Sequence, residues 1–243
     1  PVTAPPMDPD APSAGADARA DVVARLVAGG AVAVVRLPDA ARARAVVEAL
    51  VDGGITAIEL TLTTPGALDV LAALRRDGDR GLLVGAGSVL GADAARRAVD
   101  AGAEYVVSPI LEPAVLAVAH AHDVPALPGA YTPTEIHAAH AAGADLVKVF
   151  PADALGPAFV KGVLGPMPFL RLMPTGGVTP DNAGDWLRAG AVCVGLGSAL
   201  VDPRLVAAGD FAAITARARA TARAVAAARV GAGAGLTPLG ARP

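Results

Sequence analysis

The stretch GITAIELTLTTP, residues 54–65, decides the predicted fold. Apolar and polar residues alternate along it, which is typical of a β-strand with one face buried in a core. Ile58 and Leu60 should therefore face covering helices, while Glu59 and Thr61 face the inside of the sheet. The stretch ends on a threonine followed by a proline, a pair that commonly starts a helix. A strand followed by a helix is thus the predicted unit.

The same unit recurs along the chain. Short β-type runs return at intervals of roughly 20 to 27 residues, and each is followed by an Ala-rich segment with helical periodicity. Thr64, Thr132 and Thr179 each precede a proline and are predicted to cap helices. Eight units over roughly 200 residues match the count and size of an α/β (β/α)8 TIM barrel. The expected strands are residues 31–37, 55–62, 82–87, 105–110, 125–130, 146–151, 170–176 and 192–197.

An additional N-terminal helix and two tails complete the predicted organisation. The helix, capped by Asp17 and running to about Val27, should precede the first strand and close the bottom of the barrel. Residues 1–16 and 230–243 should be disordered tails around one domain of residues 17–229, because they have few groups to bury. A doubly wound open sheet is the alternative. The lack of a Gly-x-Gly-x-x-Gly turn after the first strand disfavours it.

Composition argues against several classes of partner. A net charge of −3 gives no basic field that would attract nucleic acid. Gly, Pro and charged residues interrupt every hydrophobic run, so no membrane span is expected, and the first residues lack the pattern of a signal peptide. Cys193, the single cysteine, cannot form an internal disulfide, which favours a reducing, cytoplasmic location.

Lys148 is the candidate nucleophile. It lies in the apolar run LVKVFP, residues 146–151, where an ammonium group is costly to bury in its charged form, so we expect the nucleophilic neutral amine. Glu59 is a buried carboxyl group on the second strand, and the second and sixth strands of such a barrel face each other. The two side chains can then share one cavity, as Schiff-base chemistry requires. The alternatives are a lysine that reaches solvent and a purely structural ion pair.

Two glycine-rich loops are the candidate phosphate site. Residues 174–178 read PTGGV and residues 195–199 read GLGSA, at the ends of the seventh and eighth predicted strands. Loops at these strands are the usual phosphate site of the barrel, and a helix start behind Ser198 would add its dipole. The candidate phosphate ligands are Gly176, Gly177, Gly197 and Ser198.

Two further strand ends carry candidate binding residues. Arg36 closes the first strand and could clamp a substrate carboxylate. Ser88 ends the third strand after two glycines and could donate a hydrogen bond to a ligand. His137 and His140 could in principle hold a metal, but no third ligand is evident, so we expect no metal site.

Four stretches, residues 54–61, 84–89, 146–151 and 174–178, together resemble the class I 2-keto-3-deoxy-6-phosphogluconate (KDPG) aldolases, also called 4-hydroxy-2-oxoglutarate (KHG) aldolases. The resemblance implies a homotrimeric (β/α)8 lyase that needs no metal or other cofactor and cleaves KDPG to pyruvate and glyceraldehyde 3-phosphate. It also implies that Lys148 forms the Schiff base, that Glu59 shuttles protons and that Thr175 contacts the substrate. Pro109, in the Ser-Pro turn after the fourth strand, would assist at the phosphate end.

The chain departs from the family pattern at the carboxylate-binding position. Many members carry an arginine where this chain has Thr63, and Arg36 would then bind the pyruvyl carboxylate in its place. Ser88 replaces the usual threonine and keeps the hydroxyl group. Three alternatives remain open: an aldolase for the 6-phosphogalactonate keto acid, a barrel that isomerises or only binds a phosphosugar, and a metal-dependent aldolase with Glu59 as a ligand.

Overall fold

The structure, a computed structural model, describes residues 14–38, 40–78 and 81–232. The two predicted tails, residues 1–16 and 230–243, lie mostly outside these described residues. Where they overlap, the chain is helical, because the first helix already begins at Ala14 and the last ends at Ala232. Asp17 therefore lies within the first helix and is not its cap, contrary to the prediction.

Short strands alternate with helices along the described chain. Every predicted strand run contains an observed strand, and only the run 125–130 is divided, at Pro128, which has no N–H to donate to a neighbouring strand. The strands are β1 Ala31–Val35, β2 Ala57–Thr61, β3 Leu83–Gly87, β4 Val106–Val107, β5 Ala126–Leu127, β6 Gly129–Ala130, β7 Val147–Val149, β8 Leu172–Pro174 and β9 Val194–Leu196. The helices are α1 Ala14–Gly29, α2 Ala43–Asp52, α3 Ala67–Asp77, α4 Ala92–Asp100, α5 Pro113–Ala121, α6 Pro133–Ala141, α7 Gly156–Leu164, α8 Ala183–Arg188, α9 Pro203–Ala208 and α10 Phe211–Ala232.

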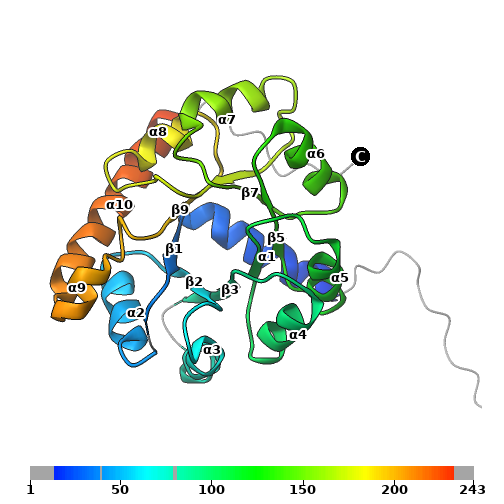
Figure 1. The fold of residues 1–243 in the computed structure, drawn as a ribbon. Helices are drawn as coiled ribbons and strands as arrows, with labels where there is room; N and C mark the ends of the chain where they lie inside the picture. The colour runs from blue at the N-terminus through cyan, green and yellow to red at the C-terminus, as the bar shows by residue number, and fades with distance from the viewer. Residues whose placement is uncertain (1–13, 39, 79–80, 233–243) are drawn as a thin grey trace, which may run out of the picture.

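The strands form a curled, parallel α/β arrangement. One sheet has the order β5-β4-β3-β2-β1-β9 and the other β6-β7-β8, and every ladder is parallel. A further bridge joins Thr175, after β8, to Gly195 of β9. Figure 1 shows the strands gathered in the middle, helices α2 to α8 around them, and α1 passing behind the strands. Apart from the β1–β9 pair, which joins the first and last strands, neighbouring strands follow one another in the sequence, which differs from the reversed order of a doubly wound sheet.

Two hydrophobic cores fill this arrangement. The larger core lies between strands and helices, where Ile58 and Leu60 of β2 pack with residues of the surrounding helices. The smaller core lies inside the curl, where Val23 and Leu26 of α1 cluster with inward-facing residues on or directly before the strands. Its strand members are Val32, Ala57, Leu83, Tyr105, Val107, Leu127, Leu146, Met173 and Cys193. This smaller core, which we call the lower core, fills the amino ends of the strands and leaves the carboxyl ends for polar side chains.

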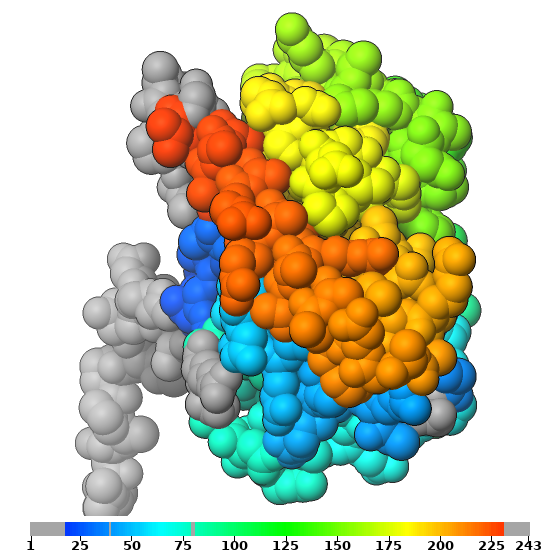
Figure 2. All heavy atoms as spheres, turned by 90° about the vertical axis from the view of Figure 1, so that its left-hand side faces the viewer, coloured from blue at the N-terminus to red at the C-terminus, as the bar shows by residue number. Residues whose placement is uncertain are grey.

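The last helix spans the junction between the first and last units. Figure 2 shows α10 running across one face of the molecule, and it packs against both α2 and α8. Thr215 of α10 donates a hydrogen bond to the carbonyl oxygen of Ala49 in α2 at 3.0 Å. Across the described residues, the helices are all too short or too polar to cross a lipid bilayer.

Candidate active site

Lys148 and Glu59 meet inside the curl of strands, directly above the lower core. Lys148 of β7 comes two residues after Leu146, which directly precedes that strand, and Glu59 comes two residues after Ala57 on β2, so both side chains point inward like those residues. The Nζ atom of Lys148 lies 3.5 Å from Oε1 of Glu59. Lys148 is 5% exposed and Glu59 is 1% exposed. The site therefore holds an amine and a carboxyl group within reach of one substrate atom and nearly out of contact with bulk water.

Small residues on β3 make room for the carboxyl group. Glu59 is level with Gly85, and Thr61 with Gly87, in the β2–β3 ladder. A Cβ atom at Gly87 would collide with the Glu59 carboxylate. The glycine is therefore required by the close approach of the Glu59 side chain rather than by a turn.

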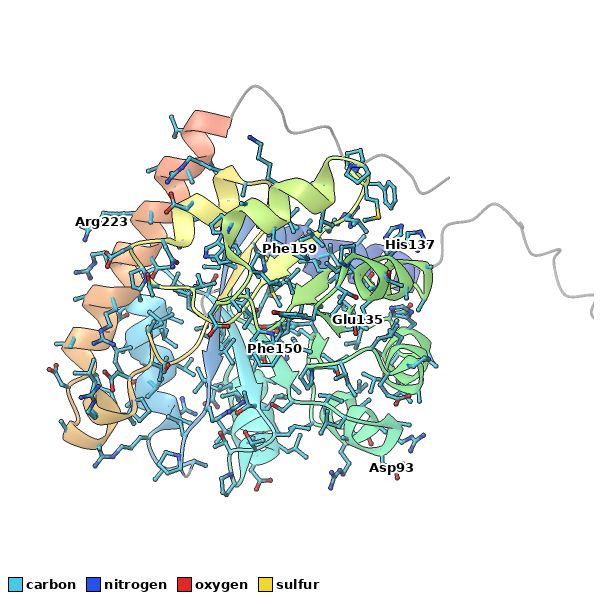
Figure 3. All side chains as sticks on the ribbon, turned by 45° about the horizontal axis from the view of Figure 1, so that its top comes forward. Asp93, Glu135, His137, Phe150, Phe159 and Arg223 are labelled. Atoms are coloured by element: carbon cyan, nitrogen blue, oxygen red, sulfur yellow. The ribbon has the colours of Figure 1, made fainter. Side chains whose placement is uncertain are left out.

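Phe150 adds an aromatic face to the amine. Its ring centroid lies 5.2 Å from Nζ of Lys148, within the range of a cation–π contact. The labelled Phe150 lies near the middle of the molecule in Figure 3, whereas His137 lies on the surrounding helix α6. The sequence interpretation did not assign Phe150 to the site. Its spacing of two residues from Lys148 on one strand was the available signal.

Arg36 lies exposed just beyond β1, at the carboxyl end of the strand. The backbone on both sides of it is held by β2 and the residues that follow: the Thr61 hydroxyl donates to the Val35 carbonyl at 3.3 Å, and the Leu37 N–H donates to the Thr64 hydroxyl at 3.0 Å. Within residues 14–38, 40–78 and 81–232, the Arg36 guanidinium has no ion-pair or hydrogen-bond partner. Among those residues it is thus an unpaired cation on a fixed backbone.

Thr63 belongs to the same cluster of hydroxyl groups. Its hydroxyl donates to that of Thr61 at 3.1 Å, and the hydroxyls of Thr61 and Thr64 are 3.4 Å apart. The sequence predicted that Thr64 caps α3, but the structure does not show this cap. That helix begins after Gly66, and the Thr64 hydroxyl instead accepts a hydrogen bond from the Leu37 N–H. The hydroxyl chain instead links the ends of β1 and β2.

The two glycine-rich loops lie side by side after β8 and β9. The bridge between Thr175 and Gly195 joins their strands, and Thr175 packs where a side chain at Gly195 would stand. Gly176 and Gly177 have φ angles of 96° and 68°, which favour glycine. At Gly197, by contrast, a Cβ atom would meet nothing within 4 Å. The loops therefore present adjacent backbone with open space at Gly197.

The chain beyond Ser198 corrects one expectation. Residues 198–200 form a turn in which the N–H groups of Leu200 and Val201 both donate to the Gly197 carbonyl at 2.9 Å. The next helix, α9, begins only at Pro203, with Asp202 as its cap. A single turn, and not the start of a helix, therefore follows directly behind Ser198.

Ser88, Pro109 and Thr175 lie at the carboxyl ends of β3, β4 and β8. Ser88 is half-buried with a φ angle of 60°, a conformation that is uncommon outside glycine. Pro109 is half-buried, and its carbonyl group lies against Gly129. Thr175 is 5% exposed. These residues share the end of the sheet on which Lys148 and Arg36 lie.

Burial changes the ionisation of two other groups inside the strands. Burial raises the pKa of the Tyr105 hydroxyl well above 10.0, and the negative charge of Glu59 adds to that shift. Burial also raises the pKa of Cys193 from 9.0 to about 12. Both groups therefore stay protonated near neutral pH. Among the described residues, no three His, Cys, Asp or Glu side chains gather as a metal site would need.

A cavity of about 830 Å³ lies outside the curl of strands, between the loops after β8 and β9 and helix α10. Thr179, Ser198, Asp202, Arg204 and Arg217 are among the residues that line it. Lys148 and Glu59 do not line it, so it is separate from the amine–carboxylate pair. Ser198 is the one candidate site residue that it includes.

A curled parallel α/β fold with a buried lysine and glutamate at the carboxyl ends of its strands defines a class of barrel-like enzymes that form covalent intermediates with carbonyl compounds. A family model described as KDPG and KHG aldolase matches residues 22–217. The chain belongs to the KDPG and KHG aldolase family.

Individual relatives agree with that assignment. The chain is 39% identical over 169 residues to 2-dehydro-3-deoxy-phosphogluconate aldolase of Treponema pallidum, covering 69% of this chain and 80% of the relative. It is 38% identical over 180 residues to a probable 2-dehydro-3-deoxy-6-phosphogalactonate aldolase of Rhizobium meliloti, covering 74% and 84%. KDPG aldolase from Legionella pneumophila, whose structure holds pyruvate as a covalent carbinolamine intermediate, superimposes with a TM-score of 0.75 at 29% identity, covering 82% and 97%.

Proposed function

We propose that this protein is a class I aldolase that cleaves KDPG to pyruvate and D-glyceraldehyde 3-phosphate. The observation that carries the proposal is the 3.5 Å approach of Lys148 Nζ to Glu59 Oε1 in a buried site. Family membership supplies the reaction, and the Lys148–Glu59 pair supplies its two chemical groups. The same pair would also serve KHG, which it would cleave to pyruvate and glyoxylate.

Lys148 and Glu59 divide the chemistry between them. The amine of Lys148 attacks the C2 ketone, and the resulting carbinolamine takes a proton from Glu59 and loses water to leave a protonated imine. Glu59 takes the proton of the C4 hydroxyl, the C3–C4 bond breaks, and its electrons move into the imine to form an enamine. Glu59 then returns the proton to C3. Hydrolysis of the imine releases pyruvate and regenerates the amine.

Arg36 is assigned to the substrate carboxylate, with Thr63 beside it. The exposed guanidinium of Arg36, which has no partner among the described residues, and the fixed backbone around it support this role, because an arginine can donate two parallel hydrogen bonds to a carboxylate. Ser88, Pro109 and Thr175 are assigned to the carbon chain of the substrate between the two ends. We assign the phosphate to Gly176, Gly177, Gly197 and Ser198. Their adjacent loops and the open space at Gly197 support that assignment.

We further propose that the two sheets form one closed barrel of eight strands. Only Pro128 separates β5 from β6, which continue one another, and the Thr175–Gly195 bridge joins β8 to β9. In this arrangement α1 is the additional helix that closes the bottom, as its contacts with the lower core support. The domain would extend over residues 17–229. A homotrimer in the cytoplasm remains part of the proposal on the strength of the family resemblance.

The test is to trap the imine. The protein is incubated with pyruvate and sodium borohydride, and peptide mass spectrometry should find a reduced three-carbon adduct on Lys148. Lys161, on α7, is the matched control and should stay unmodified. A wild-type protein that releases pyruvate from KDPG without an adduct at Lys148 would contradict the mechanism. A protein that isomerises or only binds phosphosugars would give neither adduct nor pyruvate.

The 6-phosphogalactonate keto acid is the second candidate substrate. The 38% identity to the probable galactonate-type aldolase of Rhizobium meliloti is close to the 39% identity to the gluconate-type enzyme. The two substrates differ in the configuration at C4, whose hydroxyl loses the proton in the cleavage step. A coupled assay that measures kcat/KM for both keto acids decides between them.

A further inference from the structure

Two buried polar atoms beside the Lys148–Glu59 pair have no hydrogen-bond partner among the described residues: Oη of Tyr105 and Oε2 of Glu59. We propose that Tyr105 is a positioning residue for Glu59, and that its hydroxyl donates a hydrogen bond to Oε2 through one internal water molecule. The role that this inference gives to Glu59 rests on the aldolase function proposed above. The hydrogen bond itself rests on the geometry of three neighbouring strands.

The register of these strands brings the two residues to one level. Glu59 of β2 pairs with Gly85 of β3, and Ala86 pairs with Val106 of β4. Tyr105, which precedes Val106, is therefore level with Gly85 and Glu59. A Cβ atom at Gly85 would collide with the Tyr105 ring. The ring thus lies across β3 and points its hydroxyl towards the strand that carries Glu59.

Burial makes a partner for both atoms necessary. Tyr105 is 0% exposed and Glu59 is 1% exposed, so neither atom can reach bulk water. A buried hydroxyl or carboxylate oxygen without a hydrogen bond costs about 1–3 kcal/mol, more for a charged group. Internal water molecules typically satisfy such groups when two or more polar atoms face one another. One water between Oη and Oε2 would remove both penalties.

The charges around Tyr105 fix the direction of the hydrogen bond. Burial raises the pKa of Tyr105, and the groups that add to the shift are Glu59 on β2, Glu104 beside it in the chain and Cys193 near β9. The amino group of Lys148 on β7 lies 3.5 Å from the other oxygen of Glu59, Oε1. The phenol therefore keeps its proton and acts as a donor. The water accepts this hydrogen bond and donates one of its own to Oε2 of the carboxylate.

This hydrogen bond gives the two carboxylate oxygens separate tasks. Oε1 faces Lys148 and is available to exchange protons with the substrate. The hydrogen bond to Oε2, which comes from Tyr105 next to β4, limits rotation of the carboxyl group about its terminal bond.

Tyr105→Phe tests the proposal, because it removes the hydroxyl and keeps the ring on Gly85. We expect kcat for KDPG cleavage to fall about 3- to 10-fold with KM nearly unchanged, since a positioned hydrogen bond of this kind is worth about 1 kcal/mol. Thr221→Val is the matched control: it removes a buried hydroxyl on α10 that bonds to the Arg217 carbonyl, and it should change neither quantity.

Three outcomes separate the possible failures. If the Tyr105→Phe protein is more heat-stable than wild type and has the wild-type kcat and KM, the hydroxyl was unpaired and the proposal is wrong. If the variant does not fold, a crystal structure of the wild-type protein decides, and the absence of a water within about 3.2 Å of both oxygens overturns the proposal. If wild-type protein traps no pyruvate on Lys148, the aldolase function fails, whereas the water position still reports on the hydrogen bond.

Discussion

Lys148 and Glu59 can be singled out from the sequence because each puts an ionisable group into an otherwise apolar strand. Their strand positions place both side chains inward, and their atoms lie 3.5 Å apart. Tyr105 could not be connected to them in that way. A tyrosine beside two valines predicts a buried ring, and only the packing of that ring on Gly85 gives its direction. The hydrogen bonds among the hydroxyls of Thr61, Thr63 and Thr64 could not be predicted from the sequence either, because they depend on interatomic distances that the sequence does not give.

Replacement of Glu59 should separate imine formation from carbon–carbon cleavage. In Glu59→Gln the amide cannot take up the C4 hydroxyl proton, so we expect kcat for KDPG to fall about 100- to 10,000-fold. Borohydride should still attach pyruvate to Lys148, although more slowly. Steady-state assays and peptide mass spectrometry measure the two steps. Glu48→Gln, an exposed change on α2, is the control, and near-normal cleavage by Glu59→Gln would remove Glu59 from the mechanism.

Binding of the substrate carboxylate should depend on Arg36. Arg36→Ala removes the unpaired cation after β1, and we expect KM for KDPG to rise about 10- to 100-fold, the loss of one charged hydrogen-bonded contact. Arg36→Lys should recover only part of the affinity because it cannot form the two-pronged contact. Unchanged KM values in both variants would show that another group binds the carboxylate.

The positions of strands and helices follow from periodicity, whereas their caps depend on local competition for hydroxyl groups. Of the three predicted threonine caps, Thr132 is observed, in a capping box with Glu135 at the start of α6. Thr64 bonds to Leu37 instead, and Thr179 forms a turn with Asn182 before α8. Pro113 and Pro203 start helices behind Glu112 and Asp202, a pattern that the same rule could have found if acidic caps had been considered.

The capping box should make the stability of α6 depend on pH. Hydrogen bonds from the backbone N–H groups of Thr132 and Tyr131 lower the pKa of Glu135 below 4.5. Its contribution to folding stability is therefore present above pH 4.5 and disappears as the pH falls through the lower folded-state pKa. Glu135→Gln should reduce Tm by about 1–2 °C at pH 7, and the difference should vanish in acid. Calorimetry from pH 2.5 to 7 measures it, and a constant difference would contradict the assignment.

The arrangement of the whole chain required more than the repeat of strands and helices. Eight predicted units indicated a curled parallel sheet, but they did not show that α10 would lie between α2 and α8, or that the chain beyond Ser198 would turn before a helix begins. Both depend on contacts between residues distant in sequence. The lower core, by contrast, could be anticipated in part from the inward-facing apolar residue near the start of most strands.

Cys193 reports on the integrity of the lower core. It is 0% exposed, and burial raises its pKa from 9.0 to about 12. The native protein should therefore react with a thiol reagent at pH 8 only after unfolding in denaturant. Because the folded-state pKa is the higher one, stability should decline as the pH rises from 9.0 towards 12, by at most about 1.4 kcal/mol per pH unit. Cys193→Ala should lack this part of the decline, and rapid labelling of the native thiol would show that the lower core opens.

The packing of α1 beneath the strands also bears on the order in which products depart. Val23 and Leu26 pack at the amino ends of the described strands, so we expect the substrate to reach Lys148 from the carboxyl ends, where Arg36 lies. In the proposed reaction, pyruvate remains covalently bound to Lys148 after bond cleavage. The phosphorylated aldehyde must then leave first, and a new substrate molecule cannot bind until hydrolysis of the imine releases pyruvate.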